Sequence, residues 1–552
     1  MTNLIIQVSK YLIIILMALY TFQCFTVFRK RSDEDRDFLF LRQNVLMFFL
    51  HFVAFTVLYL EIGEVTVLLF YAAQAVYLAA VLLLFTKIYP KASRLLVNNM
   101  CMLITVGFIM ITRLSYDQSI KQFQIIVVST VVALIIPVLI RKLRFITKMY
   151  WFYTLVGIGL LALVAIAAQS TNGAKLSFSF GGISVQPSEF VKIIYVFAIA
   201  GLLKNARDFR RVAIATGLAA LHVLILVVSR DLGSAVIFFV TYLVVLFVAT
   251  KNPFYVLAGL LAGSGAAVGA YFLFSHIRVR VQAWRDPFAD YQVGGYQISQ
   301  SLFSIAAGSW FGTGLYQGSP EAIPYVEQDF MFSAIAEELG SIFGICLILV
   351  CMSCFIMFVN IAMQLTNRFY RLVAVGLGAT YATQVFLTIG GGIKLIPMTG
   401  VTLPLVSYGG SSALSTLIMF SIVQGLYMLQ RDEEKKNERK IFYQENRPYQ
   451  EPYRGGAAYR TYGSQGGYAP DGWSGGDRPY GRDGYGYGSD EYGRDGYGYG
   501  PDEYGPDGYG TDGYGEDGYG YEPEEYGYGP DQYGSDEYQE TPYEERPDRR
   551  YW

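Results

Sequence analysis

The chain is poor in charged residues and in histidine. Only 16% of its 552 residues are charged, against 53% hydrophobic residues, which excludes a set of ordinary soluble domains. The three histidines lie far apart in sequence, so they offer no spacing typical of metal ligands, and we predict no metal site. These histidines are His51, His222 and His276.

Cysteine is also scarce. All five cysteines lie within or at the edge of apolar segments, where a thiol acts as a small core residue; they are Cys24, Cys101, Cys346, Cys351 and Cys354. The last two form a CxxC pair, but no second pair and no nearby histidine accompanies it. We therefore expect neither a metal nor a redox role for these thiols.

The chain is rich in long apolar runs. Runs of about 20 residues, the length needed to cross a bilayer, recur to about residue 428. The first run, Leu4 to Phe28, lacks a small-residue cleavage motif and is too long for a signal-peptide core. The sequence therefore predicts an all-α polytopic membrane protein with about 13 transmembrane helices.

Basic clusters occur at every second loop and predict the orientation. Because Lys and Arg are retained on the cytoplasmic side, we expect the N-terminus outside and the C-terminus in the cytoplasm. The clusters are Arg29, Lys30 and Arg31; Lys87, Lys91 and Arg94; and Arg141, Lys142, Arg144 and Lys148. The net charge of −2 averages these basic loops with an acidic tail, and we expect no nucleic-acid partner.

Three segments follow from this pattern. Residues 1–94 would form three N-terminal helices, and residues 95–430 would form a second helical unit with a large outer loop at 275–340. Residues 431–552 would form a cytoplasmic tail, in which RDGYGYG occurs at Arg482 and at Arg494. So little aliphatic content cannot bury a core, which predicts disorder; a Tyr-based segment that self-associates or binds a partner is the alternative.

Four acidic residues interrupt the apolar sequence YVEQDFMFSAIAEELG: Glu327, Asp329, Glu337 and Glu338. Asp329 could cap a helix that begins at Phe330. It could instead act as a general base at the membrane surface. The local sequence leaves both interpretations open.

Two further stretches on the predicted outer side carry ionisable residues. Glu189 and Lys192 are three residues apart, so they share a helix face and could pair within the membrane, as a structural ion pair or as functional groups. For Asp231, in SRDLGSA, helix capping is the favoured interpretation.

In order and spacing, several motifs together resemble the SEDS family of cell-wall proteins (shape, elongation, division and sporulation). The resemblance covers roughly Leu95 to Leu429. It is carried by NGA and QPSEFVK, by RDLGSA, by YQISQSLFSIAAGSWFGTGL, by QDFMFSAIAEELG and by PMTGVTLPLVSYGGSS. It implies a ten-helix core, here preceded by three extra helices, in a bacterial plasma membrane.

The family polymerises lipid II into peptidoglycan glycan strands, so the resemblance implies an inverting glycosyltransferase that releases undecaprenyl diphosphate. Asp329 matches the family's acidic position before F-x-F and E-E-L-G, which implies that it is the catalytic carboxylate. The substrate-binding residues that we expect are Lys175, Glu189, Lys192, Arg278, Arg280, Arg285, Lys394, Ser407 and Ser411. No cofactor is expected, except that a divalent cation, Mg²⁺ or Mn²⁺, is an alternative stabiliser of the leaving group.

Nothing in the chain resembles a transpeptidase, so the resemblance implies a class B penicillin-binding protein as a partner in trans, together with other divisome or elongasome membrane proteins. The sequence departs from the family at NGAKLS, where Leu176 and Ser177 replace a usual Arg and Trp. A lipid II flippase and a non-catalytic scaffold are the rival functions. The motifs do not separate elongation, division and sporulation.

Overall fold

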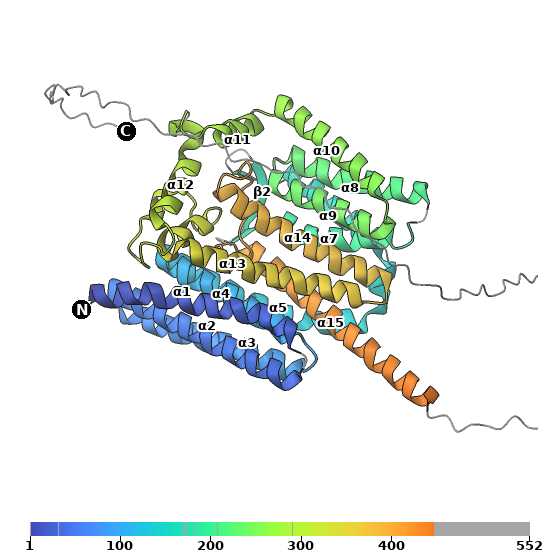
Figure 1. Cartoon of the computed structure of the whole chain (residues 1–552). Coiled ribbons are helices and arrows are strands. Elements are labelled where there is room, and N and C mark those ends of the chain that lie inside the picture. Colours follow the sequence, from blue (N-terminus) through green and yellow to red (C-terminus); the bar gives the residue numbers. More distant parts are fainter. Residues whose placement is uncertain are drawn as a thin grey trace, which may run out of the picture. The chain divides into compact units, whose positions relative to one another are not determined.

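The computed structural model describes residues 2–445, except residues 31, 168, 172, 173, 181, 182, 207 and 290. The Gly/Tyr/Asp-rich repeats, with their predicted disorder, lie outside the described residues. Figure 1 shows the described part as a bundle of long helices, which confirms the all-α polytopic class.

The helices follow one another with short connections along most of the chain. They are α1 (Thr2–Thr26), α2 (Asp33–Ile62), α3 (Val65–Ile88), α4 (Arg94–Leu114), α5 (Tyr116–Lys142), α6 (Tyr150–Ala167), α7 (Pro187–Leu203), α8 (Phe209–Val228), α9 (Leu232–Thr250), α10 (Pro253–Leu273), α11 (Ser275–Arg285), α12 (Tyr296–Gly308), α13 (Met331–Gln364), α14 (Arg368–Gly392) and α15 (Gly410–Glu445). Short 3₁₀ turns occupy Val27–Arg29, Arg144–Lys148 and Pro320–Ala322, and a π turn occupies Tyr291–Gly295.

Twelve of these helices, within the described residues, are long and apolar enough to cross a membrane. They are α1–α6, α8–α10 and α13–α15. Helix α7 has 17 residues and packs between α6, α9 and α14 (Figure 1). With α7 the count agrees with the expectation of about 13 helices.

The loop between α6 and α7 contains a small antiparallel sheet that the sequence analysis did not predict. Its strands are β1 (Gln169–Thr171), β2 (Ala174–Phe180) and β3 (Ile183–Val185), in the order β1-β2-β3. In the register, Phe178 lies opposite Val185. The sheet leads directly into Pro187, the first residue of α7.

The three N-terminal helices are an integral part of the bundle. Helix α1 packs against α13 and α2 packs against α4. Asn99 of α4 joins them, since its side-chain oxygen accepts from Tyr20 at 3.1 Å and from Cys24 at 3.2 Å, and its amide donates to Ser353 at 3.0 Å. A buried amide with partners on two other helices fixes how these helices sit against one another.

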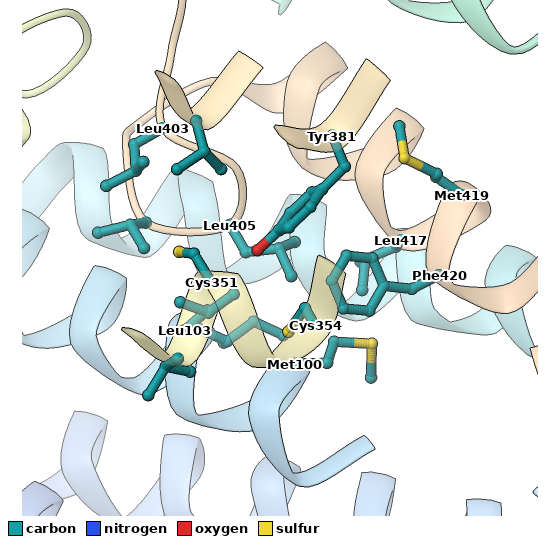
Figure 2. Close-up of a cluster of buried hydrophobic side chains, with 14 of the residues drawn as sticks. Met100, Leu103, Cys351, Cys354, Tyr381, Leu403, Leu405, Leu417, Met419 and Phe420 are labelled. Atoms are coloured by element: carbon teal, nitrogen blue, oxygen red, sulfur yellow. The ribbon is translucent and has the colours of Figure 1, made fainter. Parts of the chain in front are cut away.

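The buried cysteines pack as core residues. Figure 2 shows Cys351 and Cys354 of α13 among Met100, Tyr381 and Phe420, which come from α4, α14 and α15. Cys351 is 3% exposed and Cys354 is 0% exposed, and both are free thiols. Their burial among apolar side chains is the role expected of small hydrophobic residues.

Two element boundaries differ from the sequence prediction. The outer loop predicted to end at residue 340 includes a helical segment from Met331, which meets the membrane-spanning part of α13 at a break in Gly340. The tail expected from residue 431 begins later, because α15 continues to Glu445 through a charged segment. Charged residues are good helix formers, so the end of an apolar run does not end a helix.

Candidate functional site

The break in α13 receives the loop that follows α12. Gly340 has φ 88° and ψ 163°, a conformation essentially restricted to glycine. The helix carbonyls freed beside this break accept backbone N–H groups: Thr313 donates to Glu337 at 2.8 Å and Gly314 donates to Glu338 at 2.9 Å. A Cβ at Gly312 would lie 2.3 Å from the Glu338 carbonyl oxygen. The GTG motif, residues 312–314, therefore packs directly on the backbone of the EELG motif, residues 337–340.

A buried arginine that the sequence analysis missed secures this contact. Arg113, near the end of α4, donates to Glu338 at 2.8 Å and to Glu321 at 2.6 Å. It also donates to the Gly318 carbonyl at 3.2 Å, and its guanidinium lies 4.2 Å from the ring centroid of Tyr316. Glu338 therefore has a structural role, because its carboxylate holds the Arg113 guanidinium.

Asp329 lies at the end of the loop that this arrangement holds, directly before α13. Its backbone N–H donates to the Tyr325 carbonyl at 3.1 Å. The N-cap of α13 is Phe330, which makes no side-chain capping bond, so the prediction that Asp329 caps this helix is wrong. The Asp329 carboxylate is half-buried and has no hydrogen-bond partner within the described residues.

The loop between α14 and α15 approaches the carboxylate from the other side. Asp329 Oδ2 lies 3.8 Å from the position that a Cβ would occupy at Gly400. The same loop is joined to the α13 side by Tyr408, whose backbone N–H donates to the Glu327 carbonyl at 2.7 Å. Two motifs about 70 residues apart in sequence thus meet at Asp329, as expected of one site.

Among the three predicted arginines of α11, only Arg280 reaches this loop. It donates to the carbonyls of Met398 at 3.4 Å and Thr399 at 3.3 Å. Arg278 and Arg285 are exposed. They are seven residues apart and so share a helix face, whereas Arg280 lies on another face.

Burial is the main influence on Asp329. It raises the pKa of this carboxyl to about 6, because the charged form loses contact with water. The positive charge of Arg280 acts in the opposite direction and lowers the pKa, while the charge of Glu327 raises it. A carboxylate with a pKa near neutrality is suited to take up a proton and release it.

Two other predicted residues belong to the α14–α15 loop. Lys394 has φ 59°, and its carbonyl accepts from Trp284 Nε1 of α11 at 3.1 Å. Ser407 is buried, and its Oγ accepts from the Leu403 N–H at 3.0 Å. Ser407 thus closes a turn within the loop, and Lys394 contributes backbone contact as well as its charge.

Ser411 belongs to a polar network centred on Asp231. Its Oγ accepts from the Gln186 N–H at 3.0 Å, and the Gln186 amide donates to Asp231 at 3.3 Å. Ser188 also donates to Asp231, at 2.9 Å. The other oxygen of Asp231 accepts from the Ser234 N–H at 3.1 Å, so Asp231 caps α9, which confirms the favoured interpretation.

Glu189 and Lys192 form the predicted ion pair, at 2.6 Å. Both side chains are buried in α7, 9% and 3% exposed. Lys192 also donates to Gln384 of α14, and Glu189 accepts from Ser415 of α15. A buried ion pair within a membrane is costly unless both charged groups are hydrogen-bonded, and this pair has such bonds to two further helices.

The remaining predicted residue, Lys175, lies in β2 opposite Ser170; its side chain lies outside the described residues. The structure thus joins Asp329 and Arg280 to the α14–α15 loop. Glu189 and Lys192 lie in a buried cluster that reaches the same loop through Gln384, whose amide donates to the Thr402 carbonyl at 3.1 Å. Among described side chains, no group of three or more His, Cys, Asp or Glu residues could hold a metal ion. Residues 325–329 and 393–409 therefore supply the candidate site.

Comparison with known proteins identifies the family of the chain. Residues 93–432 match the family described as FtsW/RodA/SpoVE, cell cycle protein. The peptidoglycan glycosyltransferase RodA of Mycobacterium leprae is 34% identical over 360 residues, which is 60% of this chain and 77% of that protein. The stage V sporulation protein E of Bacillus subtilis is 33% identical over 273 residues, which is 48% of this chain and 73% of that protein.

A solved structure shares the fold. It is a chain of a peptidoglycan synthase complex that coordinates polymerisation and crosslinking, with a TM-score of 0.54 and 26% identity, covering 61% of this chain and 98% of that chain. The match to the family spans more than half of the 552 residues. The chain therefore belongs to the FtsW/RodA/SpoVE family of cell cycle proteins, the SEDS family that its motifs resemble.

Proposed function

We propose that this protein polymerises lipid II into peptidoglycan glycan strands at the outer face of a bacterial plasma membrane. One observation carries the proposal. The Asp329 carboxylate lies between two family motifs beside Arg280, has no hydrogen-bond partner in the described part of the chain and has its pKa raised to about 6. The relatives named peptidoglycan glycosyltransferases support the reaction class.

Asp329 is the general base of this proposal. The 4-hydroxyl of the acceptor sugar attacks the anomeric carbon of the donor and transfers its proton to the Asp329 carboxylate. The bond to undecaprenyl diphosphate breaks in the same step, and its electron pair leaves with the diphosphate. A single displacement inverts the α-linked donor to a β-linked product, so no covalent enzyme intermediate is needed.

Cations stabilise the diphosphate as its charge develops. Arg280 is near enough to Asp329 for its charge to lower the pKa of that carboxyl. The exposed Arg278 and Arg285 extend the positive charge along α11. We assign the stabilisation to these side chains and to Lys394 of the α14–α15 loop. The alternative of a Mg²⁺ or Mn²⁺ ion carried by the substrate is tested by polymerisation with and without EDTA.

The partner that we propose is a class B penicillin-binding protein, which would crosslink the strands in trans. The similarity to a chain of a complex that coordinates polymerisation and crosslinking supports this partner. Other divisome or elongasome membrane proteins would complete the assembly. The orientation that we propose puts the N-terminus and Asp329 outside and the C-terminus in the cytoplasm, in accord with the basic loops.

Polymerisation by the purified full chain with its partner tests the proposal. Wild type should convert lipid II into glycan polymer, and Asp329→Asn should lose at least about a hundredfold in rate, the usual contribution of a general base. Glu327→Gln is the matched control, since Glu327 also lies in this loop and should retain most activity. Equal polymer from wild type and Asp329→Asn would refute the role of Asp329. Translocation of lipid II without polymer would favour a flippase, and neither activity would favour a scaffold.

A further inference from the structure

A polar pocket lies at the ends of the helices that are opposite to Asp329. It is lined by Lys204, Arg211 and Arg368, together with Asp208, Asn205 and Asn367. These residues come from the α7–α8 and α13–α14 connections and from the first turns of α8 and α14. Helix α7 begins beside the Asp231 network and runs for 17 residues, about 25 Å, before it reaches this pocket.

The pocket is positively charged, with three cations against one carboxylate. The hydrogen bonds of these cations go mainly to neutral carbonyls: Lys204 donates to Thr147 at 2.8 Å and Arg211 donates to Asn205 at 3.2 Å. Arg368 donates to the Ala249 carbonyl. The Arg211–Asp208 pair is long, at 3.8 Å, and both side chains are exposed. Neither the carbonyls nor this weak pair cancels the positive charge.

Aromatic side chains occur close to the pocket residues in sequence or in contact with them. Phe209, next to Asp208, is 73% exposed, and Trp151 is 49% exposed. Trp151 neighbours Tyr150, and the Lys204 ammonium lies 5.4 Å from the centroid of the Tyr150 ring. Aromatic residues of this kind lie at the level of lipid headgroups. Together with the position of the pocket at the ends of the membrane-spanning helices, these residues favour a place for the pocket near the level of the headgroups.

We propose that this pocket binds the headgroup phosphate of an anionic phospholipid, in the leaflet opposite to Asp329. Guanidinium groups match phosphate oxygens in shape and charge, and basic pockets between transmembrane helices bind anionic headgroups. The lipid would hold the end of α7 against the end of α14. These two helices also share the Glu189–Lys192–Gln384 cluster, so the lipid stabilises the same helix pair that the buried cluster joins.

Native mass spectrometry of the full chain, titrated with phosphatidylglycerol or with phosphatidylcholine, tests this site. Wild type should retain phosphatidylglycerol in preference to phosphatidylcholine. The triple variant Lys204→Gln, Arg211→Gln, Arg368→Gln should bind it about a hundredfold more weakly, because each basic residue near an anionic surface contributes about fivefold to binding. The control Lys435→Gln, Lys436→Gln, Arg439→Gln removes three exposed cations of α15 and should bind as wild type does.

Two results would overturn the proposal. One is equal retention of phosphatidylglycerol by wild type and the triple variant. The other is protection against thermal unfolding by inorganic phosphate alone, with no retained lipid, which would assign the pocket to free phosphate. If the triple variant does not fold, Arg211→Gln decides the question, since this exposed side chain can change without loss of packing and should still weaken binding severalfold.

Discussion

Arg113 and Glu338 form a buried ion pair between α4 and α13, with Nε and Oε1 2.8 Å apart and the two side chains 4% and 0% exposed. Arg113 also binds Glu321 and the Gly318 carbonyl. One guanidinium thus fixes the loop before Asp329 to the helix that follows it. We infer that Arg113 positions the catalytic loop without touching the substrate.

Replacing Arg113 by Met should destabilise the protein by about 3–5 kcal/mol, because Glu338 would keep a buried carboxylate without its cation. Thermal unfolding of the purified protein measures this loss. Glu321→Gln is the control: Glu321 is 52% exposed, and an exposed pair contributes only about 0–1 kcal/mol. Similar losses for the two variants would contradict the assignment. The double variant Arg113→Met, Glu338→Leu should recover much of the loss, since the buried carboxylate at 338 is gone as well and Glu321, which keeps its charge, is exposed.

Gly340→Ala should abolish the docking of the loop on α13. A Cβ at Gly340 would lie 2.4 Å from the Gly312 nitrogen and 2.5 Å from the Trp310 carbonyl oxygen. The backbone strain alone costs about 1–3 kcal/mol, and the clash with the backbone adds to it. Gly63→Ala is the matched control, because Gly63 has φ 76° but nothing within 4 Å of its Cβ position. Its cost should be about 1–2 kcal/mol. Folded-protein yield and melting temperature compare the two, and an equal effect would show that the contact with Gly312 contributes nothing.

Local spacing predicted part of the site. Glu189 and Lys192 had to share a helix face, and Asp231 preceded an apolar helix as a cap does. Both expectations match the structure. The family pattern identified Asp329, but the local sequence could not choose between cap and base. The structure removes the first option, because Phe330 is the N-cap.

The rest depended on tertiary packing. Arg113 lies 225 residues before Glu338, and at the end of an apolar run it was indistinguishable from an ordinary interface residue. Arg278, Arg280 and Arg285 were equivalent in sequence, and only the orientation of α11 brings Arg280 to the Thr399 carbonyl. No local pattern encodes which helix faces meet, since that choice is made by the whole bundle.

Polymerisation by wild type should rise with pH through an apparent pKa of about 6 and then level off, because only the deprotonated Asp329 can accept the proton. The initial rate at low lipid II concentration, measured between about pH 4.5 and 8, reports this pKa for the free enzyme. A flat profile across this range would contradict general-base catalysis by Asp329.

Arg280→Gln should move this acidic limb to higher pH. The positive charge of Arg280 lowers the pKa of Asp329 and so partly offsets the effect of burial. Without Arg280, burial should raise the pKa of Asp329 further. Arg280→Lys is the matched control, because it keeps the charge and should keep the limb near its original position. If the acidic part of the pH–rate profile of Arg280→Gln does not move and only the maximal rate falls, Arg280 stabilises the leaving group and does not influence the pKa of Asp329.

Asp329→Asn should be more stable than wild type at about pH 7.5, although it is inactive. Burial raises the pKa of Asp329 from 3.8 to about 6, so the folded state favours the protonated form. The cost in stability is therefore small below about pH 4, where both states are protonated, grows as the pH rises from about 4 to about 6, and levels off above that, where both states are charged. Asparagine carries no charge and avoids this cost, which is on the order of 3 kcal/mol at about 1.4 kcal/mol for each pKa unit. Melting temperatures of the two proteins should differ at pH 7.5 and converge near pH 4. An equal or lower melting temperature for Asp329→Asn at pH 7.5 would show that the charged Asp329 carboxylate does not destabilise the folded protein.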